Sequence, residues 1–350
     1  MSVKSQTICG KVSAVFIFLL FFQVALAQPD FSELDRKLEA SKKELGGNVV
    51  ALIYKDGKLV YQKALGTDFN AKTQAPIASC SKWLTAALVM SFVDQGKLSL
   101  DDKVSKYLPV FTKYSKGYIT IKDCLAHLTG IESEPIRMLS LLGRKKYASL
   151  EEEVNDFASK KDIMANPGLE FRYSNIGLNI AGRVLEVLTR RSFEQLMQEH
   201  ITRPLMMRNT SFSSFNAVNP SGGAISTASD YMNFLSMILN KGLFNGKRIL
   251  SEKAIAEMQT VRTTPAMIKY APKAAEGYNY GFGAWVLQAD ENGQAQVLAS
   301  PGLFGTWPMV DFCRGYACIF FTKGGLGEER KEIFMDMKQS IDAQLSSACK

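Results

Sequence analysis

Residues 77–90 read IASCSKWLTAALVM, a short polar start followed by an apolar run. The pattern predicts a largely buried helix over residues 79–95 that ends at Gly96. Ser79 and Lys82 lie three residues apart, so on the first turn of such a helix both side chains fall on one face. The stretch therefore predicts a hydroxyl and an amine side by side at the start of a buried helix.

This pair has a catalytic and a structural interpretation. A serine hydroxyl becomes a strong nucleophile only when a base removes its proton. A lysine can be that base if burial and neighbouring cations lower its pKa, and a chain with only two histidines, His127 and His200, favours a base other than imidazole. Alternatively, Ser79 only caps the helix, because the Ser-x-x-Lys pattern is weak and recurs at residues 347–350. The pair alone leaves both interpretations open.

The composition is that of a soluble globular protein. The chain has 350 residues, 46% of them apolar and 22% charged, which suffices for one large domain or two interleaved ones. The net charge of +8 is spread along the sequence, and no basic block alternates with aromatic residues, so nucleic-acid binding is not expected. The cysteines lack zinc-ligand spacing and histidines are few, so no metal or cofactor is expected.

Residues 1–27 have the features of a secretory signal sequence. Two lysines precede the apolar block VSAVFIFLLFF, and small residues follow it. The alternative is a membrane anchor, but the block is short for a span, and no cysteine stands at the cleavage point to carry a lipid. We expect cleavage between Ala27 and Gln28, no stable membrane anchor, and a secreted or periplasmic protein of residues 28–350.

Export would permit disulfides. Five of the six cysteines follow the leader, an odd number, so at least one thiol is free or pairs outside the chain. The segment VDFCRGYACIFF predicts two strands joined by a turn, which could place Cys313 opposite Cys318. A pair of Cys80 with Cys124 is a second possibility.

Strands are predicted near both ends of the chain and helices in the middle. Two apolar runs around residues 55–58, KDGK, predict a hairpin. Further strands are expected at 280–288, 295–300, 306–313 and 316–323, before a final helix over 328–346. The expected class is α+β, with an antiparallel sheet flanked by helices and built from about 28–95 and 275–350. A mainly helical domain of about 96–274 is inserted, and a cleft is expected between the parts.

A second polar motif lies in NPGLEFRYSNIGLNIAGRVLEVL, residues 166–188. Tyr173 and Asn175 fall in the turn between an extended entry and an amphipathic helix, from which both can point into a cleft. Tyrosine can accept a proton when cations favour its phenolate, and Asn175 can bind a substrate carbonyl or orient Lys82. Alternatively, Tyr173 packs and Asn175 caps the helix. The same spacing at Tyr231 falls on the apolar face of a predicted helix and is interpreted as structural.

A third motif lies in VLASPGLFGTWPMVD, residues 297–311, where a strand is expected to carry Ser300, Pro301, Gly302 and Leu303. Gly302 would let a substrate approach the backbone. Proline lacks a donor and is tolerated on an edge strand that faces a cleft, where the Leu303 N–H would be free to bind an oxyanion. Alternatively, this is only an irregular start of a strand.

Taken together and in this order, the motifs resemble the serine β-lactamase and penicillin-binding-protein superfamily. The pattern is most similar to the class C β-lactamase-like branch, which includes peptidases, esterases and acyltransferases. The similar segments are residues 79–109, 119–131, 166–186, 221–239 and 280–286. The resemblance implies a β-lactamase/transpeptidase-like fold over nearly all of residues 28–350.

The resemblance also implies an acyl-enzyme mechanism. Ser79 would be the nucleophile, Lys82 and Tyr173 would share the base and acid roles, and Asn175 would position substrate. The backbone N–H groups of Ser79 and Leu303 would form the oxyanion hole, with Ser300 and Gly302 beside the substrate. His127, in the segment 119–131, is expected to order a loop rather than act in catalysis.

One departure from the family pattern affects the expected substrate. The third motif usually begins with Lys or His, which helps to hold a substrate carboxylate, whereas here it begins with Ser300. We therefore expect a small ester, amide or peptide as substrate and an esterase or amidase activity. The alternatives are a β-lactamase or D,D-carboxypeptidase, and a catalytically weak protein that binds β-lactams or peptidoglycan fragments. Arg172 or Lys323 could replace the missing charge if the fold brought either one into the cleft.

Overall fold

A computed structural model of the chain describes residues 29–135, 147–324 and 330–349. The expected signal sequence and its cleavage point lie outside these ranges. Among the residues described, no helix is both long and apolar enough to cross a membrane.

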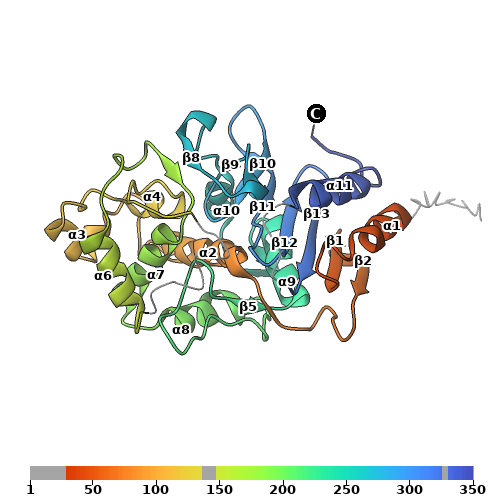
Figure 1. The fold of residues 1–350 in the computed structure, drawn as a ribbon, viewed down its shortest axis with the longest axis horizontal. Coiled ribbons are helices and arrows are strands. Elements are labelled where there is room, and N and C mark those ends of the chain that lie inside the picture. The colour runs from red at the N-terminus through yellow and green to blue at the C-terminus, as the bar shows by residue number, and fades with distance from the viewer. Residues whose placement is uncertain (1–28, 136–146, 325–329, 350) are drawn as a thin grey trace, which may run out of the picture.

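The largest element is a seven-stranded antiparallel sheet built from both ends of the chain (Figure 1). Its strand order is β2-β1-β13-β12-β11-β10-β9. The strands are β1 (Val49–Lys55), β2 (Lys58–Leu65), β9 (Asn279–Tyr280), β10 (Trp285–Ala289), β11 (Ala295–Ala299), β12 (Trp307–Asp311) and β13 (Tyr316–Thr322). The predicted hairpin is β1–β2, and β1 pairs along its whole length with β13 from the other end of the chain. The predicted α+β class, with its sheet from both termini, is confirmed.

Both faces of this sheet are covered, which explains why β1 is an uninterrupted apolar run. Val50 and Leu52 face one core, whereas Val49, Ala51 and Ile53 face a second core. Helices α1 (Ser32–Ser41) and α11 (Lys331–Asp342) from the two ends of the chain cover the second core. Helix α9 (Ala228–Leu239) packs against β13, β1 and β12 on the opposite face.

The middle of the chain is mainly helical and lies beside the sheet (Figure 1). Its helices are α3 (Val110–Lys113), α4 (Ile121–Leu125), α6 (Leu150–Lys160), α7 (Ile176–Thr189), α8 (Phe193–Met197) and α10 (Glu252–Gln259). Short 3-10 turns are η2 (Val104–Lys106), η4 (Pro265–Met267) and η5 (Lys273–Ala275), and η3 (Gln198–Thr202) is a π-helical turn. Two-strand pairs join β3 (Ala75–Pro76) to β5 (Ile225–Ser226), β4 (Phe171–Arg172) to β8 (Ile268–Tyr270), and β6 (Leu243–Phe244) to β7 (Lys247–Arg248).

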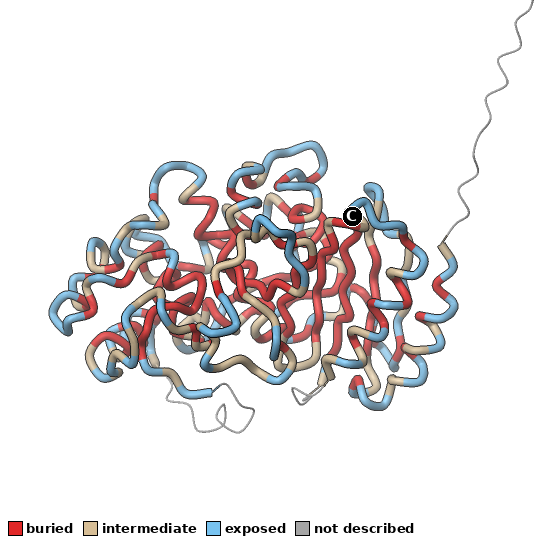
Figure 2. The backbone as a smooth tube through the Cα atoms, turned by 90° about the horizontal axis from the view of Figure 1, so that it is seen from above, coloured by how far each residue is buried: buried red, intermediate tan, exposed pale blue. Residues whose placement is uncertain are grey.

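Helix α2 (Ser81–Asp94) is the predicted buried helix, and it contacts both the helical part and the rest of the core. All its residues from Ser81 to Phe92 are buried, so its apolar run needs no polar face. Figure 2 shows buried residues continuing from the strands into the helical part without a break. The 3-10 turn η1 (Ala78–Cys80) precedes α2, so Ser79 lies just before the α-helix rather than in it. Ala78 has a left-handed φ of 45°, which redirects the chain into this turn.

The predicted Cys313–Cys318 disulfide is wrong. Cys313 is joined to Cys349 of the C-terminal tail, whereas Cys318 is a free, buried thiol. Cys318 lies in β13 opposite Met309 of β12 and packs in the second core, while Cys313 lies in the turn beyond β12. The strand register therefore keeps Cys313 and Cys318 apart. Cys80 and Cys124, the other suggested pair, are also free and buried.

Candidate active site

The side chain of Lys82 is buried at the centre of the site, with 0% exposure. It projects from the first turn of α2, and its nitrogen lies 3.3 Å from the hydroxyl oxygen of Ser79. It donates to the side-chain oxygen of Asn175 at 3.0 Å and to the backbone carbonyl of Ser221 at 2.9 Å. Three oxygen atoms thus surround the nitrogen, which suits the hydrogen-bonding capacity of a lysine head group.

Tyr173 and Asn175 lie where β4 leads into α7, as the turn pattern predicted. Tyr173 is buried, and the Lys82 nitrogen lies over its ring, 4.8 Å from the centroid. Asn175 precedes α7, but its side chain makes no capping hydrogen bond and instead accepts from Lys82. The structure therefore brings Ser79, Lys82, Tyr173 and Asn175 together at the junction of α2 and α7.

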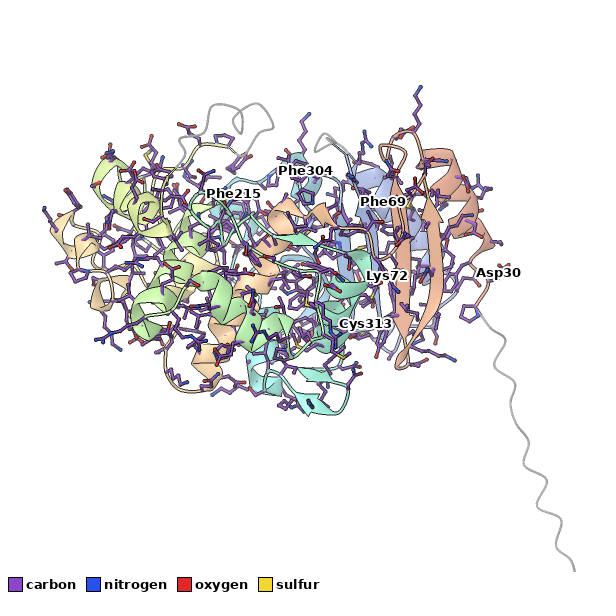
Figure 3. All side chains as sticks on the ribbon, turned by 90° about the horizontal axis from the view of Figure 1, so that it is seen from below. Asp30, Phe69, Lys72, Phe215, Phe304 and Cys313 are labelled. Carbon is purple, nitrogen blue, oxygen red and sulfur yellow. A yellow bond between two sulfur atoms is a disulfide. The ribbon has the colours of Figure 1, made fainter. Side chains whose placement is uncertain are left out.

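The third motif reaches the site as a turn and not as the strand that the sequence suggested. Strand β11 ends at Ala299, and residues 302–305 form a turn before β12. The Gly302 N–H donates to the Thr306 carbonyl at 2.8 Å and closes this turn. Hydrogen bonding toward β12 continues past β11, because the Ser300 N–H donates to the Pro308 carbonyl at 3.3 Å. Pro301 lies between these two bonds, where its missing N–H is not needed for the pairing. Phe304, in the same turn, lies between the sheet and the helical part in Figure 3.

Gly302 is required because the turn packs directly on η1. A Cβ atom at this position would lie 2.4 Å from the Ile77 carbonyl oxygen and 3.0 Å from the Cys80 sulfur. No side chain fits at that distance from a backbone oxygen. The contact sets the Leu303 backbone beside Ser79, and both residues line the same recess.

The Ser300 hydroxyl is not placed to bind a charged substrate group. It donates to the carbonyls of Gly283 at 3.2 Å and Ser79 at 3.4 Å, and the residue is 2% exposed. Ser300 therefore fixes the turn to the residues behind η1. It does not supply the cation that the family pattern usually has at this point.

A small recess of about 40 Å³ opens in front of the nucleophile. It is lined by Ser79, Tyr173, Pro272, Ala274, Pro301, Gly302 and Leu303, none of them charged. Arg172 does not replace the missing cation, because its guanidinium forms an ion pair with Glu170 at 3.0 Å. Lys323 is exposed and is not part of the recess either.

Ser221, which holds Lys82, belongs to a buried polar chain that the sequence did not reveal. The Ser221 N–H donates to the Asn179 side-chain oxygen at 3.0 Å, and the Asn179 amide donates to Glu153 at 2.9 Å. Asn179 lies one helical turn after Asn175, so its spacing could have indicated a shared face of α7. Glu153 and Ser221 come from distant segments, and only the tertiary structure joins them.

His127 is buried beside Tyr173, with the ring centroids 4.7 Å apart. Its Nε2 lies 3.2 Å from the hydroxyl of Tyr280. Burial, with a smaller contribution from the charge of Lys82, holds the pKa of His127 well below its usual value. The imidazole is therefore neutral at pH 7.

Two residues with apparently reactive groups next to the nucleophile are structural. Burial raises the pKa of the Cys80 thiol well above its usual range, so a thiolate does not compete with Ser79. Tyr231, which shares the Tyr-x-Asn spacing, is fully buried and donates its hydroxyl to the Cys80 carbonyl at 2.8 Å. Its interpretation as a packing residue of α9 is confirmed.

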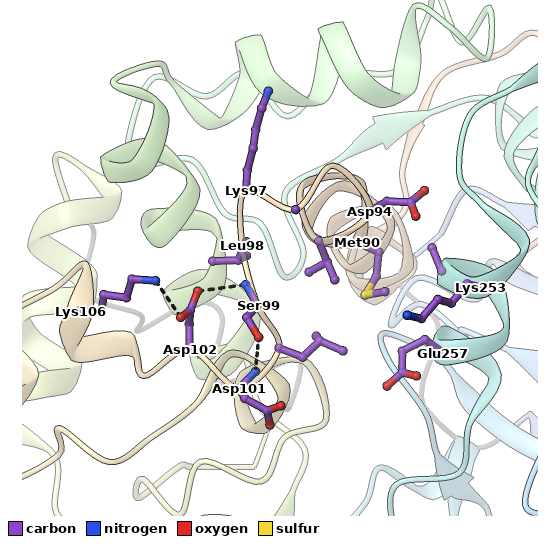
Figure 4. A pocket seen from close by; sticks show the side chains of 14 residues that line it. Met90, Asp94, Lys97, Leu98, Ser99, Asp101, Asp102, Lys106, Lys253 and Glu257 are labelled. Carbon is purple, nitrogen blue, oxygen red and sulfur yellow. Dashed lines mark hydrogen bonds and ion pairs between the residues drawn. The ribbon is translucent and has the colours of Figure 1, made fainter.

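A larger pocket of about 620 Å³ lies at the opposite end of α2 (Figure 4). Helix α2 has 14 residues, so this pocket is about 20 Å from Ser79. Its carboxylates already have protein partners: Asp102 accepts from Lys106 and Ser99, and Asp94 accepts from Ser251. In the described ranges, no three His, Cys, Asp or Glu side chains are grouped so as to hold a metal ion. The smaller recess is the one lined by Ser79 and Tyr173, which the sequence motifs singled out.

The chain has relatives among known proteins and solved structures. The chain is similar to protein flp of Staphylococcus aureus (strain MW2), with 30% identity over 178 residues, 47% of this chain and 34% of flp. It therefore spans about a third of the length of that curated relative. It is also similar to the D-alanyl-D-alanine-carboxypeptidase/endopeptidase AmpH of Escherichia coli (strain K12), with 22% identity over 79% of each protein.

Among solved structures, a putative beta-lactamase from Bacteroides dorei is similar with a TM-score of 0.79 and 28% identity. The match covers 90% of this chain and 99% of that one. The family model described as Beta-lactamase matches residues 34–339. That range includes the sheet, the helical part and the Ser79 site, and the chain therefore belongs to the β-lactamase family of serine hydrolases.

Proposed function

We propose that the protein hydrolyses a small, uncharged ester, amide or peptide through an acyl-enzyme on Ser79. The observation that carries the proposal is the buried Lys82 nitrogen 3.3 Å from the Ser79 hydroxyl, where it also contacts Asn175 and Ser221. As a neutral amine, Lys82 has two N–H groups and one lone pair. In that neutral form, its N–H groups can donate to the acceptors on Asn175 and Ser221, and its lone pair can take the Ser79 proton across the 3.3 Å contact.

The acylation step balances with the residues of the site. The Ser79 oxygen bonds to the substrate carbonyl carbon while its proton moves to Lys82. The oxyanion accepts hydrogen bonds from the Ser79 and Leu303 N–H groups, and each such donor is worth roughly 3 to 4 kcal/mol in known enzymes. Tyr173 gives its phenolic proton to the leaving oxygen or nitrogen as the bond to the acyl carbon breaks. Asn175 orients Lys82 and lies within reach of the substrate.

Deacylation restores the starting state. The Tyr173 phenolate takes a proton from a water molecule, and the hydroxide bonds to the acyl carbon. When the bond from that carbon to the Ser79 oxygen breaks, Lys82 returns its proton to the serine. No group other than water is consumed.

The preference for an uncharged substrate is supported by the lining of the recess. Among the residues that the structure describes, no charged side chain lines it, and Ser300 turns its hydroxyl toward backbone carbonyls. A substrate carboxylate would therefore lose its hydration without gaining a cationic partner, which is costly. An ester or amide with a small apolar acyl group avoids this cost.

We further propose that the protein is secreted or periplasmic. The basic and apolar pattern of residues 1–27 supports export, with cleavage between Ala27 and Gln28. The Cys313–Cys349 disulfide supports an oxidising compartment, because structural disulfides are rare in the cytosol. N-terminal sequencing of the exported protein would test the cleavage point.

Labelling with a fluorophosphonate, followed by peptide mass mapping, tests the nucleophile. The proposal expects one label, on Ser79, which Ser79→Ala abolishes and Ser81→Ala, two residues further on, leaves in place. Absence of labelling in folded protein would contradict it and favour a protein that only binds its ligand. Turnover of a short-chain aryl ester would then be compared with that of a chromogenic cephalosporin.

The second candidate function is a β-lactamase or D,D-carboxypeptidase. It is favoured by the similarity to AmpH, which covers 79% of each protein. Rapid turnover of the cephalosporin with slow turnover of the aryl ester would support this alternative and contradict the preference for uncharged substrates.

A further inference from the structure

His127 binds the backbone on both sides of Tyr173. Its carbonyl oxygen accepts from the Arg172 N–H at 3.2 Å, and its Nδ1 accepts from the Ser174 N–H at 3.4 Å. The imidazole also packs against the Tyr173 ring. One buried residue thus contacts the tyrosine and the two residues that flank it in the chain.

These contacts fix the tautomer of the imidazole. A backbone N–H can only donate, so Nδ1 must accept and carries no proton. The proton of the neutral ring is therefore on Nε2, which lies 3.2 Å from the Tyr280 hydroxyl oxygen. Tyr280 is itself buried, and its ring packs against Trp285 and Tyr173. The histidine is held from behind by groups that belong to the sheet.

The backbone of His127 is strained in a way that this role explains. Its φ is 57°, in the left-handed region that only a few per cent of residues other than glycine adopt, although histidine tolerates it better than most. This conformation allows the carbonyl and the ring of one residue to face the same turn. Sequence reasoning expected His127 only to order a loop, and the turn that it orders is the one that carries Tyr173 and Asn175.

We propose that His127 is a positioning residue that holds Tyr173 and Asn175 in register with Lys82 and touches no substrate itself. The inference rests on the function proposed above for Tyr173. If the histidine is removed, the Arg172–Asn175 turn loses its side-chain partner, and the phenol and amide can shift relative to Lys82. A shift of about 1 Å at a catalytic group can lower a rate about a hundredfold.

The test compares three variants of the full chain. His127→Ala removes the ring. His127→Asn keeps a side-chain acceptor for the Ser174 N–H, and asparagine tolerates a left-handed φ. His200→Asn is the matched control, because His200 is the other histidine of the chain and packs against Phe92, away from the site.

We expect His127→Ala to lower kcat for the aryl ester about a hundredfold, with KM changed less than about threefold. His127→Asn should recover about tenfold of that loss, since it restores a side-chain acceptor for the Ser174 N–H, the flanking contact that His127→Ala removes. His200→Asn should stay within about twofold of the unsubstituted protein. A folded His127→Ala protein with full kcat, or a His127→Asn protein no better than His127→Ala, would overturn the proposal.

Nitrogen-15 NMR of the two imidazoles gives a readout that does not depend on activity. The proposal expects an unprotonated Nδ1 and a protonated Nε2 for His127. The His127 ring should stay neutral at pH 6. The signals of His200 are assigned by their loss in His200→Asn. A proton on Nδ1 would overturn the inference even if the kinetics agreed. If Ser79 is not labelled by fluorophosphonate, the proposed function fails, and the NMR result still decides whether His127 binds the Tyr173 turn.

Discussion

At the scale of single residues, Tyr173 and Tyr231 show how the surroundings of a tyrosine distinguish a candidate site residue from a packing residue. Each is followed two positions later by asparagine. Tyr173 follows a short strand and has the Lys82 nitrogen over its ring, whereas Tyr231 lies within α9 and donates to the Cys80 carbonyl. The same pair of residue types therefore has different chemistry, because only one of them meets a cation and an open recess.

Matched Tyr→Phe substitutions test this difference. Tyr173→Phe removes the proposed proton donor, so kcat for the aryl ester should fall about a hundredfold or more, with little change in thermal stability. Tyr231→Phe removes one buried hydrogen bond, which should lower the free energy of unfolding by about 1 kcal/mol and leave kcat within about threefold. Kinetics and thermal unfolding measure both effects. Equal loss of kcat in the two variants would count against the assigned role of Tyr173.

At the scale of elements, the proposed oxyanion hole depends on the turn between β11 and β12. Strand β12 is central in the sheet, so its register with β13 fixes where the turn ends. The turn then packs on η1 at Gly302, which leaves no room for a Cβ atom. Ser79 and the Leu303 N–H come from segments more than 200 residues apart in the sequence, and we expect this contact to align them.

Gly302→Ala should therefore impair both stability and catalysis. The added methyl group would meet the Ile77 carbonyl, and overpacking of this kind costs about 1 to 3 kcal/mol. The displaced turn would withdraw one oxyanion donor, so kcat should fall about 10² to 10³-fold. Gly293→Ala, in the β10–β11 hairpin, is the control: its φ of 74° makes alanine cost stability there too, but its Cβ would meet nothing within 4 Å, and kcat should not change. A Gly302→Ala protein with normal kcat would show that this contact does not align the oxyanion hole.

At the scale of the whole molecule, the two ends of the chain are held together away from the site. Helix α11 is fixed to the sheet by Lys338, which contacts both the buried Asp311 at 2.9 Å and Asp342 at 2.7 Å. The Cys313–Cys349 disulfide then attaches the C-terminal tail to the turn beyond β12. This turn is at the end of β12 opposite to residues 302–305, so the attachment should affect stability without changing the active site.

Cys349→Ser tests whether the disulfide affects stability without affecting the active site. The bond closes a loop with a sequence separation of 36 residues, and losing it should lower the free energy of unfolding by about 2 to 4 kcal/mol. At 25 °C kcat should be unchanged. Urea unfolding with and without dithiothreitol is the measurement: the reductant should lower the stability of the unsubstituted protein to that of Cys349→Ser and leave the variant as it is. A variant as stable as the unsubstituted protein would show that the disulfide contributes nothing.

The sequence by itself determined the parts of this protein that depend on local pattern. The apolar run after Ser79 requires a buried helix, the KDGK turn requires a hairpin, and the three-residue spacing places Ser79 and Lys82 on one side. The polar residues 173 and 175 had to lie in a turn, because the apolar period of α7 begins only after them. These features follow from backbone geometry over a few consecutive residues, so the local pattern of residue types is enough to predict them.

Only the tertiary structure decided which distant segments meet. Cys313 pairs with Cys349 and not with the nearer Cys318, because strand register turns Cys318 into the core. Residues 302–305 form a turn that packs on η1, whereas the sequence suggested that a strand carries residues 300–303. The roles of Ser221 and His127 likewise depend on contacts across long stretches of chain. Such contacts depend on how whole helices and strands pack together, and the spacing of residues along the sequence does not specify that packing.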